Sequence, residues 1–278
     1  MKRIKSLKER WVLITGAAGG IGTVLTRQVL QEGARVILVD KNFERLTELK
    51  DELATETVQI FEADLARKES LFGFCDKIED QDVDVLVNNA GVVYSGSFEH
   101  MDLEDFEQVQ SINLYAAVRL TRRLLPKLIA RRGHIVNVAS GAGLMAPGGL
   151  CAYATSKYGL VGYSEALRAE LHGRVGVSAI CPYFVKTQIV KNSLLGSNIA
   201  AEDRDEHLAK LDQMVQMVGT KTARVGKVII KSIKKNKGLV PVGFNTRLLW
   251  AIAKYFPRFA NYLNNLVYRK LGERGYIK

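Results

Sequence analysis

A tyrosine and a lysine stand four residues apart in this chain, in the run Tyr153-Ala154-Thr155-Ser156-Lys157. On a helix this spacing places both side chains on one face, one turn apart. A free tyrosine ionises at a pKa of about 10, but a neighbouring ammonium stabilises the phenolate and lowers that pKa. The pair can therefore donate and accept a proton, although the same spacing also arises by chance on surface helices.

A glycine-rich turn lies upstream, in residues 15–22. It follows an apolar run at residues 11–14 and precedes helical periodicity over residues 21–30, which indicates strand, turn and helix. The backbone N–H groups of such a turn and of the helix N-terminus can bind a pyrophosphate. Gly16 would allow the tight turn, Gly20 the close approach of a phosphate, and Gly22 close packing of the helix on the strand.

Asp40 ends the next apolar run, residues 35–39. Its carboxylate can accept hydrogen bonds from the adenosine ribose and would repel a 2′-phosphate, which favours NAD over NADP. Lys41 acts in the opposite direction, because its ammonium could neutralise Asp40 or hold a phosphate itself. We therefore predict NAD as the cofactor, with NADP less favoured.

Apolar strand patterns alternate with helical patterns along the chain, and this alternation predicts βαβ units. We expect a single α/β domain over residues 1–243, with a Rossmann-type, doubly wound, seven-stranded parallel sheet and a C-terminal helical extension; the length alone would also allow two small domains. Residues 188–220 lack a strand pattern and are interpreted as a substrate lid at the carboxyl edge of the sheet. The remaining expected strands are 58–61, 83–87, 134–138, 176–180 and 239–242, and the expected helices are 43–53, 104–130, 153–172 and 223–236.

The composition favours a protein of the cytoplasm. Cys75, Cys151 and Cys181 show no metal-ligand spacing and are expected to be reduced, so no metal site is predicted. The basic N-terminus lacks the apolar stretch of a signal peptide, and no apolar segment approaches the length of a spanning helix.

Six motifs follow one another along the chain: the glycine-rich turn at residues 15–22, Asp64-Leu65, Asn88-Asn89-Ala90-Gly91, Asn113, Ser140, and Tyr153 with Lys157. Together they resemble the classical short-chain dehydrogenases/reductases over about residues 10–190. The resemblance implies that Ser140 donates a hydrogen bond to the substrate oxygen, Tyr153 exchanges its proton, and Lys157 lowers the tyrosine pKa and holds the nicotinamide ribose. It implies that Asn113 anchors a water leading from Lys157 to solvent, and that Asn88 supports the central strand. The catalytic residues so predicted are Asn113, Ser140, Tyr153 and Lys157, and the cofactor-binding residues are Gly16, Gly20, Ile21, Gly22, Asp40, Asp64 (to the adenine), Leu65, Asn89, Ala90, Gly91, Tyr153, Lys157, Pro182, Val185 and Thr187 (to the carboxamide).

The chain departs from the family after the sixth strand, where Pro182-Tyr183 replaces the usual Pro-Gly pair. The added ring would narrow the pocket beside the nicotinamide. Apolar residues nearby favour a lipophilic alcohol or ketone of fatty-chain, steroid or retinoid type, although they could equally be core residues. They are Leu144, Met145, Ala146, Pro147, Tyr183, Phe184, Leu194 and Leu195.

The basic charge is concentrated at the C-terminus. From Lys221 onward there are 14 Lys and Arg against the single acid Glu273, a net charge of +13, whereas residues 1–220 carry 26 basic and 28 acidic residues, a net charge of −2. Residues 244–278 read as two amphipathic helices joined at Pro257, with apolar stripes beside basic residues. Such helices can lie in a lipid headgroup plane, so residues 244–270 could contact an anionic membrane. They could instead pack on their own domain or on a second subunit, and no nucleic-acid partner is predicted because the basic residues form no recognisable module.

The leading hypothesis is an NAD(P)-dependent oxidoreductase that interconverts a secondary alcohol and a ketone by hydride transfer, with Tyr153 as general acid and base. The resemblance also implies a homo-oligomer. From the composition and the basic tail, we expect a location in the cytoplasm, or a peripheral position at the inner face of a membrane. An extended-type epimerase or dehydratase fits less well, because no sizeable substrate domain follows. The alternative from another class is a non-catalytic cofactor-binding or membrane-surface scaffold of the same fold.

Overall fold

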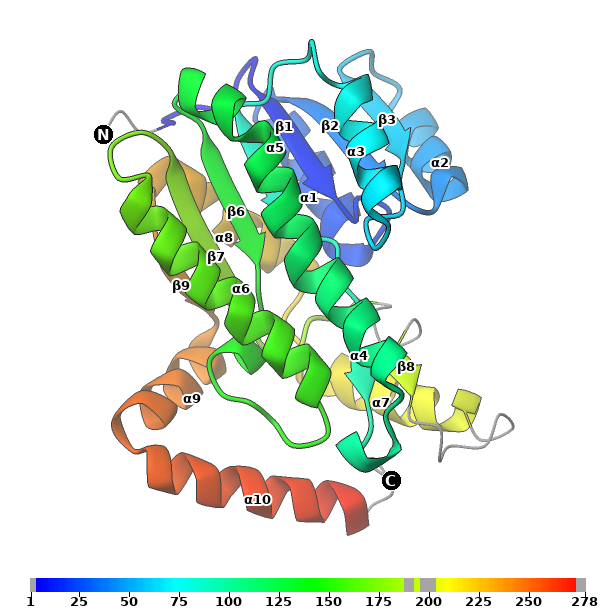
Figure 1. Ribbon diagram of the computed structural model, residues 1–278, viewed down its shortest axis with the longest axis vertical. Coiled ribbons are helices and arrows are strands. Elements are labelled where there is room, and N and C mark those ends of the chain that lie inside the picture. Colours follow the sequence, from blue (N-terminus) through cyan, green and yellow to red (C-terminus); the bar gives the residue numbers. More distant parts are fainter. Residues whose placement is uncertain (1–3, 188–192, 196–203, 274–278) are drawn as a thin grey trace.

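The computed structural model describes residues 4–187, 193–195 and 204–273. Its centre is a seven-stranded parallel sheet in the order β3-β2-β1-β4-β6-β7-β9, so the chain starts in the middle, winds to one edge and returns to build the other half (Figure 1). This confirms the predicted single doubly wound α/β domain. The strands are β1 (Trp11–Thr15), β2 (Arg35–Asp40), β3 (Val58–Glu62), β4 (Val85–Asn88), β6 (His134–Val138), β7 (Gly176–Pro182) and β9 (Leu239–Val242).

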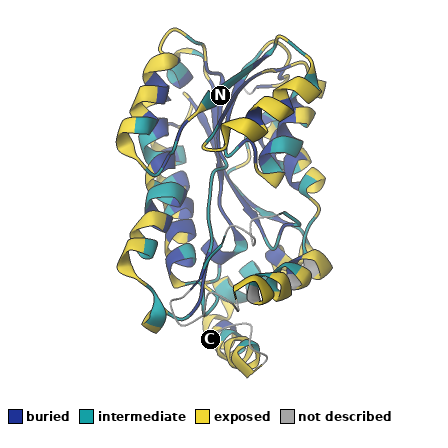
Figure 2. Cartoon of the chain, turned by 90° about the vertical axis from the view of Figure 1, so that its right-hand side faces the viewer, coloured by how far each residue is buried: buried dark blue, intermediate teal, exposed yellow. Residues whose placement is uncertain are grey.

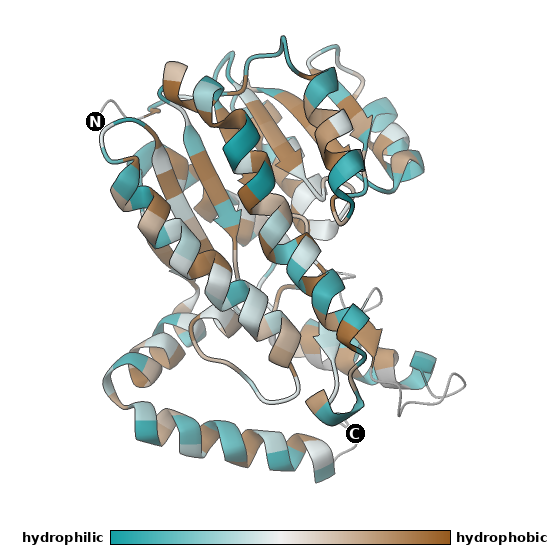
Figure 3. Ribbon diagram, in the orientation of Figure 1, coloured by the Kyte–Doolittle hydropathy of each residue, from teal (hydrophilic) through white to brown (hydrophobic). Residues whose placement is uncertain are grey.

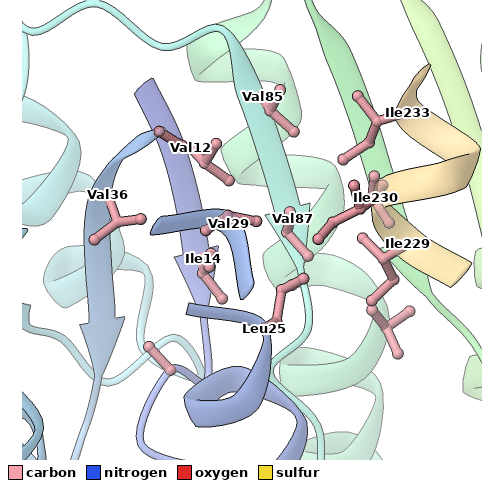
Figure 4. Close-up of a cluster of buried hydrophobic side chains, with 14 of the residues drawn as sticks. Val12, Ile14, Leu25, Val29, Val36, Val85, Val87, Ile229, Ile230 and Ile233 are labelled. Carbon is pink, nitrogen blue, oxygen red and sulfur yellow. The ribbon is translucent and has the colours of Figure 1, made fainter. Parts of the chain in front are cut away.

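Alternate strand residues build two hydrophobic layers, one on each face of the sheet (Figure 2). Val12 and Ile14 pack under α1 (Gly20–Gln31), α2 (Phe43–Leu53) and α8 (Thr222–Lys235), and Figure 4 shows Leu25 and Ile229 in this layer. Leu13 faces the opposite layer. That layer lies beneath α3 (Lys68–Lys77), α5 (Ala116–Ala130) and α6 (Cys151–Glu170). Both faces of the sheet are therefore buried, as expected for parallel strands.

Two helical features differ from the sequence analysis. Helix α3 was not predicted, because Gly73 and scattered charges interrupt its apolar pattern. The long helix expected over residues 104–130 is divided into α4 (Leu103–Gln110), the π-helical turn η2 (Ser111–Tyr115) and α5. A π turn adds one residue to a single turn and so leaves little trace in the overall periodicity.

The region after β7 contains a strand that the sequence analysis missed. Residues Leu194–Leu195 form β8, which pairs in parallel with β5 (Tyr94–Ser95) in a separate two-stranded sheet. Helix α7 (Arg204–Val218) follows. Of the predicted lid, residues 188–192 and 196–203 lie outside the described part of the chain. Two-residue strands are too short to show an alternating pattern.

The C-terminal extension consists of α9 (Phe244–Tyr255) and α10 (Pro257–Glu273). Helix α10 runs across the end of the molecule toward which the strands point (Figure 1), and hydrophilic and hydrophobic residues alternate along it (Figure 3). Trp250 packs against the core cluster of Leu144, and Ala260 is buried. One side of the extension thus packs on its own domain, while Phe259 and Tyr262 remain exposed. No helix in the described residues is long and apolar enough to cross a bilayer.

Asp84 is a fully buried carboxylate near the amino ends of the central strands. It accepts hydrogen bonds from Arg10 at 2.5 Å, from Arg131 at 3.0 Å and from the Trp11 N–H at 3.0 Å. Burial alone would raise the pKa of Asp84, but these hydrogen bonds outweigh it and hold the pKa below its ordinary value. The charged form is therefore stabilised by folding.

We expect Asp84→Asn to lower the free energy of unfolding by about 3 kcal/mol at pH 7, because two arginines lose a buried partner. Since the folded-state pKa is depressed, this contribution is present above the unfolded pKa of about 3.9 and is lost as the pH falls through the folded-state pKa. Urea unfolding at pH 7 and pH 3 measures both effects. The control is Asp82→Asn, whose exposed carboxylate lies 3.3 Å from Arg131 and should cost at most about 1 kcal/mol; equal losses in the two variants would contradict this account.

Candidate active site

The glycine turn between β1 and α1 has the geometry of a phosphate-binding loop. Gly16 has a φ of +62°, and a Cβ on it would lie 2.8 Å from the Ala90 Cα, so a side chain at this position is strongly disfavoured. Helix α1 begins at Gly20 with no side-chain cap, and both Gly19 and Gly20 are exposed. The first N–H groups of α1 are therefore available to an anion.

The Thr15 hydroxyl, which the sequence analysis included only as part of the glycine-rich turn, holds this turn in place. Thr15 Oγ1 accepts hydrogen bonds from the backbone N–H groups of Asn89 at 2.9 Å and Ala90 at 3.0 Å. The Asn89 side-chain amide donates to the carbonyl oxygens of Thr15 at 2.9 Å and Gly16 at 3.0 Å. Asn89, predicted to bind the cofactor, thus joins the end of β4 to the glycine turn.

The two predicted adenosine contacts lie at neighbouring strand ends. Asp40 Oδ2 accepts from the Ala18 N–H at 3.1 Å, so this carboxylate lies against the glycine turn. Asp64 Oδ1 accepts from the Ala66 N–H at 3.0 Å, and Leu65 is buried. The salt bridges of the described residues include none between Lys41 and Asp40.

Tyr153 and Lys157 lie on one face of α6, opposite the end of β6 that carries Ser140. The Lys157 ammonium is 5.6 Å from the centre of the Tyr153 ring. Burial raises the pKa of the Tyr153 phenol, and a hydrogen bond with Ser140 acts against this rise. The net direction is upward because burial is the largest influence, and the expected lowering by Lys157 stays a prediction.

Lys157 is buried and donates to the Val138 carbonyl oxygen at 3.0 Å. Burial lowers the pKa of Lys157 to about 8. A Cβ on Gly91 would lie 3.4 Å from the Lys157 Nζ, so the residues that contact the glycine turn also border the lysine. Cys181 is buried beside Tyr153 and Lys157, and burial raises the pKa of its thiol to about 12. The thiol is therefore uncharged; all three cysteines are unpaired.

Asn113 enters this group because of the π turn η2. Its Oδ1 accepts from the Val92 N–H at 2.8 Å, and its Nδ2 donates to the Val92 carbonyl at 2.9 Å and to Ser156 Oγ at 3.0 Å. The side chain is therefore fixed by protein groups on both sides. Ser156 in turn donates to the Tyr153 carbonyl at 2.7 Å, which joins η2 to α6.

The segment after β7 returns to the glycine turn. A Cβ on Gly20 would lie 2.9 Å from Thr187 Cγ2, so Thr187 faces the first turn of α1. Pro182 and Val185 are buried, and Val185 forms a bridge with Thr220. These predicted cofactor contacts thus lie at the same edge as the turn.

The predicted apolar cleft is partly core. Leu144 packs with Leu160 and Val161 inside the domain, and Leu194 packs against Tyr94. Tyr183 packs edge-on against Phe184, with ring centres 4.6 Å apart, and both remain partly exposed. Met145, Ala146 and Pro147 are also at least partly exposed.

These residues fit a dinucleotide. The uncapped N-terminus of α1 would hold the pyrophosphate, Asp40 and Asp64 the adenosine, and Lys157 the nicotinamide ribose. Thr187 would meet the carboxamide. The arrangement places a hydroxyl, a phenol and a buried amine beside one edge of a nucleotide-binding turn.

The family described as short chain dehydrogenase matches residues 10–197, more than half of the chain. The chain therefore belongs to the short-chain dehydrogenase/reductase family, and its motifs are those of the classical branch. It is an NAD(P)-dependent dehydrogenase of that family.

Individual proteins agree with this assignment. Estradiol 17-beta-dehydrogenase 11 of Mus musculus is 34% identical over 218 residues, covering 74% of this chain and 73% of that protein. A short chain dehydrogenase/reductase from Burkholderia phymatum, in complex with NAD, has the same fold with a TM-score of 0.82 and 23% identity, over 91% of this chain and 96% of that one. The closed form of serine dehydrogenase complexed with NADP+ gives a TM-score of 0.72 at 28% identity, over 84% and 94%. Structural relatives thus bind either nucleotide.

Proposed function

We propose that this protein interconverts a lipophilic secondary alcohol and a ketone, with Tyr153 as general acid and base. The observation that carries the proposal is that Tyr153 lies next to Ser140, with its ring centre 5.6 Å from the ammonium of the buried Lys157, at the edge that holds the glycine turn. A hydroxyl donor and a phenol that can share one ligand oxygen are suited to a carbonyl or an alcohol.

In the reducing direction, Ser140 donates a hydrogen bond to the carbonyl oxygen and the Tyr153 O–H gives its proton to the same oxygen. A reduced nicotinamide held by these residues would supply the hydride that the reduction needs. Positioned proton transfer contributes a factor of about 10² to 10⁴, and orientation of the two reactants contributes much of the remainder. Lys157 holds the ribose and returns a proton to Tyr153; Asn113, fixed against Val92, anchors the water through which that proton is replaced.

We expect Tyr153→Phe to reduce turnover of lipophilic alcohols and ketones by about 10² to 10⁴, while NADH affinity changes less than threefold. Tyr163→Phe is the matched control, because Tyr163 lies further along α6, where it packs against a hydrophobic core cluster that contains neither Ser140 nor Tyr153. Steady-state kinetics with a substrate panel and NADH fluorescence titration provide the readouts. If wild type and Tyr153→Phe are equally inactive while NADH binds both, the scaffold hypothesis is correct instead.

The proposed substrate class rests on the aromatic and apolar rim. Tyr183 and Phe184 stand after β7, and Met145 and Pro147 follow Ser140 on the other side. The name of the murine relative, an estradiol dehydrogenase, supports a steroid-type substrate. Fatty-chain and retinoid alcohols share the same apolar chemistry and belong in the same panel.

We further propose a preference for NAD. The Asp40 carboxylate lies at the glycine turn, where it can bond ribose hydroxyls and repel a 2′-phosphate. Asp40→Asn keeps an oxygen to accept from Ala18 but removes the charge.

For Asp40→Asn, we expect the ratio of kcat/KM for NAD over NADP to fall at least tenfold, because the repulsion of the phosphate is removed. Parallel kinetics with both nucleotides measure this ratio. Lys41→Ala should leave the ratio within threefold; a large loss of NADP use in that variant, with no change in Asp40→Asn, would show that Lys41 selects the nucleotide.

The extension supports a proposed contact with an anionic membrane. On α10, Phe259, Tyr262 and Leu266 recur at helical spacing and are all exposed. Arg269 and Lys270 are exposed near this stripe. Apolar insertion combined with about 1 kcal/mol for each basic residue near the surface would give reversible binding to the membrane.

A homo-oligomer, as the family resemblance implies, remains a prediction.

We expect the full chain to bind vesicles of phosphatidylserine and phosphatidylcholine weakly, and to dissociate at high salt. Phe259→Ser/Leu266→Ser should reduce co-sedimentation several-fold. Phe72→Ser, an exposed phenylalanine on α3, should not. Equal binding to neutral vesicles, or no loss in the double variant, would contradict a membrane role for this stripe.

A further inference from the structure

The loop of residues 146–149 lies between Ser140 and Tyr153 in the chain, on the rim of the proposed substrate site. It has contacts from three different parts of the molecule. The Gly149 carbonyl accepts from the Gly96 N–H at 3.0 Å, next to β5. Ala146 and Tyr158 of α6 line the same cavity.

The third partner is the C-terminal helix α10. Asn264 Nδ2 donates to the Ala146 carbonyl at 2.8 Å, and Asn264 Oδ1 accepts from the Gly148 N–H at 3.3 Å. A single side-chain amide therefore joins two peptide groups of the loop. A primary amide has a donor and an acceptor side by side, which suits this pair of groups.

Tyr268, one turn further along α10, packs on the loop at Gly148. A Cβ on Gly148 would lie 2.6 Å from the Tyr268 ring, so the absence of a side chain lets the ring approach the backbone. A cavity of about 510 Å³ lies between the loop and α6, with Asn264 at its border. Asn264 thus contacts the loop at the border of this cavity, and Tyr268 contacts the loop at Gly148.

We infer that Asn264 and Tyr268 are positioning residues of the substrate site, so that α10 completes this site by holding the loop 146–149. The inference rests on the proposed function, because the loop matters to catalysis only if the substrate lies between Ser140 and Tyr153. The loop is also connected to the two-stranded sheet of β5 and β8. Gly149 accepts a hydrogen bond from Gly96, which follows β5, and β5 pairs with β8. A shift of α10 would therefore alter the shape of the substrate rim and leave the glycine turn in place.

This role is compatible with an exposed outer surface of α10. Ala260, Asn264 and Tyr268 recur every four residues: Ala260 is buried, and the other two contact the loop although Tyr268 stays partly exposed. Phe259 and Tyr262 lie on another side of the helix. The helix can therefore hold the loop and present its apolar stripe at the same time.

The first test compares Asn264→Ala with Asn265→Ala, its exposed neighbour on the same helix. In Asn264→Ala we expect KM for the lipophilic substrate to rise about fivefold or more, with kcat within twofold and NADH affinity unchanged. Hydrogen–deuterium exchange of the peptide covering residues 141–150 should accelerate at least tenfold, because the Gly148 N–H loses its acceptor. Asn265→Ala should match wild type in every measurement.

The second test uses the close contact at Gly148. Gly148→Ala should raise KM by displacing the Tyr268 ring, and Tyr268→Ala in the same chain should relieve part of that rise. Additive effects of the two substitutions would show that the ring is not seated on the loop in solution.

The outcomes separate this inference from the proposed function. Unchanged exchange and unchanged KM in Asn264→Ala, alongside a Tyr153→Phe variant that loses turnover, would overturn the inference alone. If no alcohol or ketone is turned over by the wild type, the proposed function fails, and the exchange measurement then decides only whether α10 holds the loop.

Discussion

The burial of both faces of the central strands determines where this protein can do chemistry. Residues such as Val12, Leu13 and Ile14 alternate between two helix-covered layers, and all are fully buried. A polar side chain in the middle of such a strand would lose its hydrogen bonds to water and could not reach a substrate. The reactive groups therefore collect where the strands end, and the parallel arrangement brings all those ends to one edge. The glycine turn, Asp40 and Ser140 all lie there for this reason.

The buried polar groups at this edge are stabilised by hydrogen bonds between elements. Thr15 and Asn89 join β1 to the end of β4, and Asn113 joins the residues after β4 to η2 and α6. Lys157 donates to the end of β6. Burial raises the pKa of Tyr153 and lowers the pKa of Lys157. Both groups therefore favour their neutral forms more than they would in water. The pKa of Lys157 is thereby brought to about 8, closer to neutral pH, whereas the raised pKa of Tyr153 keeps its phenol protonated as a donor.

Much of this arrangement could be predicted from the sequence, because the strand ends carry recognisable residue types at fixed spacing. The seven-stranded sheet and the glycine turn follow from local patterns, and the resemblance to the family implies that Ser140 and Tyr153 share one site. Features that depend on three-dimensional contacts could not be predicted. Asn113 was predicted through the family resemblance, but the π turn that carries it was not, because such a turn adds one residue without changing the apolar periodicity. Asn264 meets the loop at Gly148 across more than a hundred residues of sequence, and the upward pKa shift of Tyr153 depends on its burial.

The central claim is that a hydroxyl, a phenol and a buried amine converge on one ligand beside the glycine turn. A crystal structure of the protein with NAD+ and an unreactive lipophilic alcohol analogue tests this claim most directly. We expect the pyrophosphate at the N-terminus of α1, the nicotinamide ribose bonded to Lys157, and the analogue oxygen within hydrogen-bond distance of both Ser140 and Tyr153. A nicotinamide ring bound away from Tyr153, or an analogue oxygen that contacts neither hydroxyl, would contradict the account.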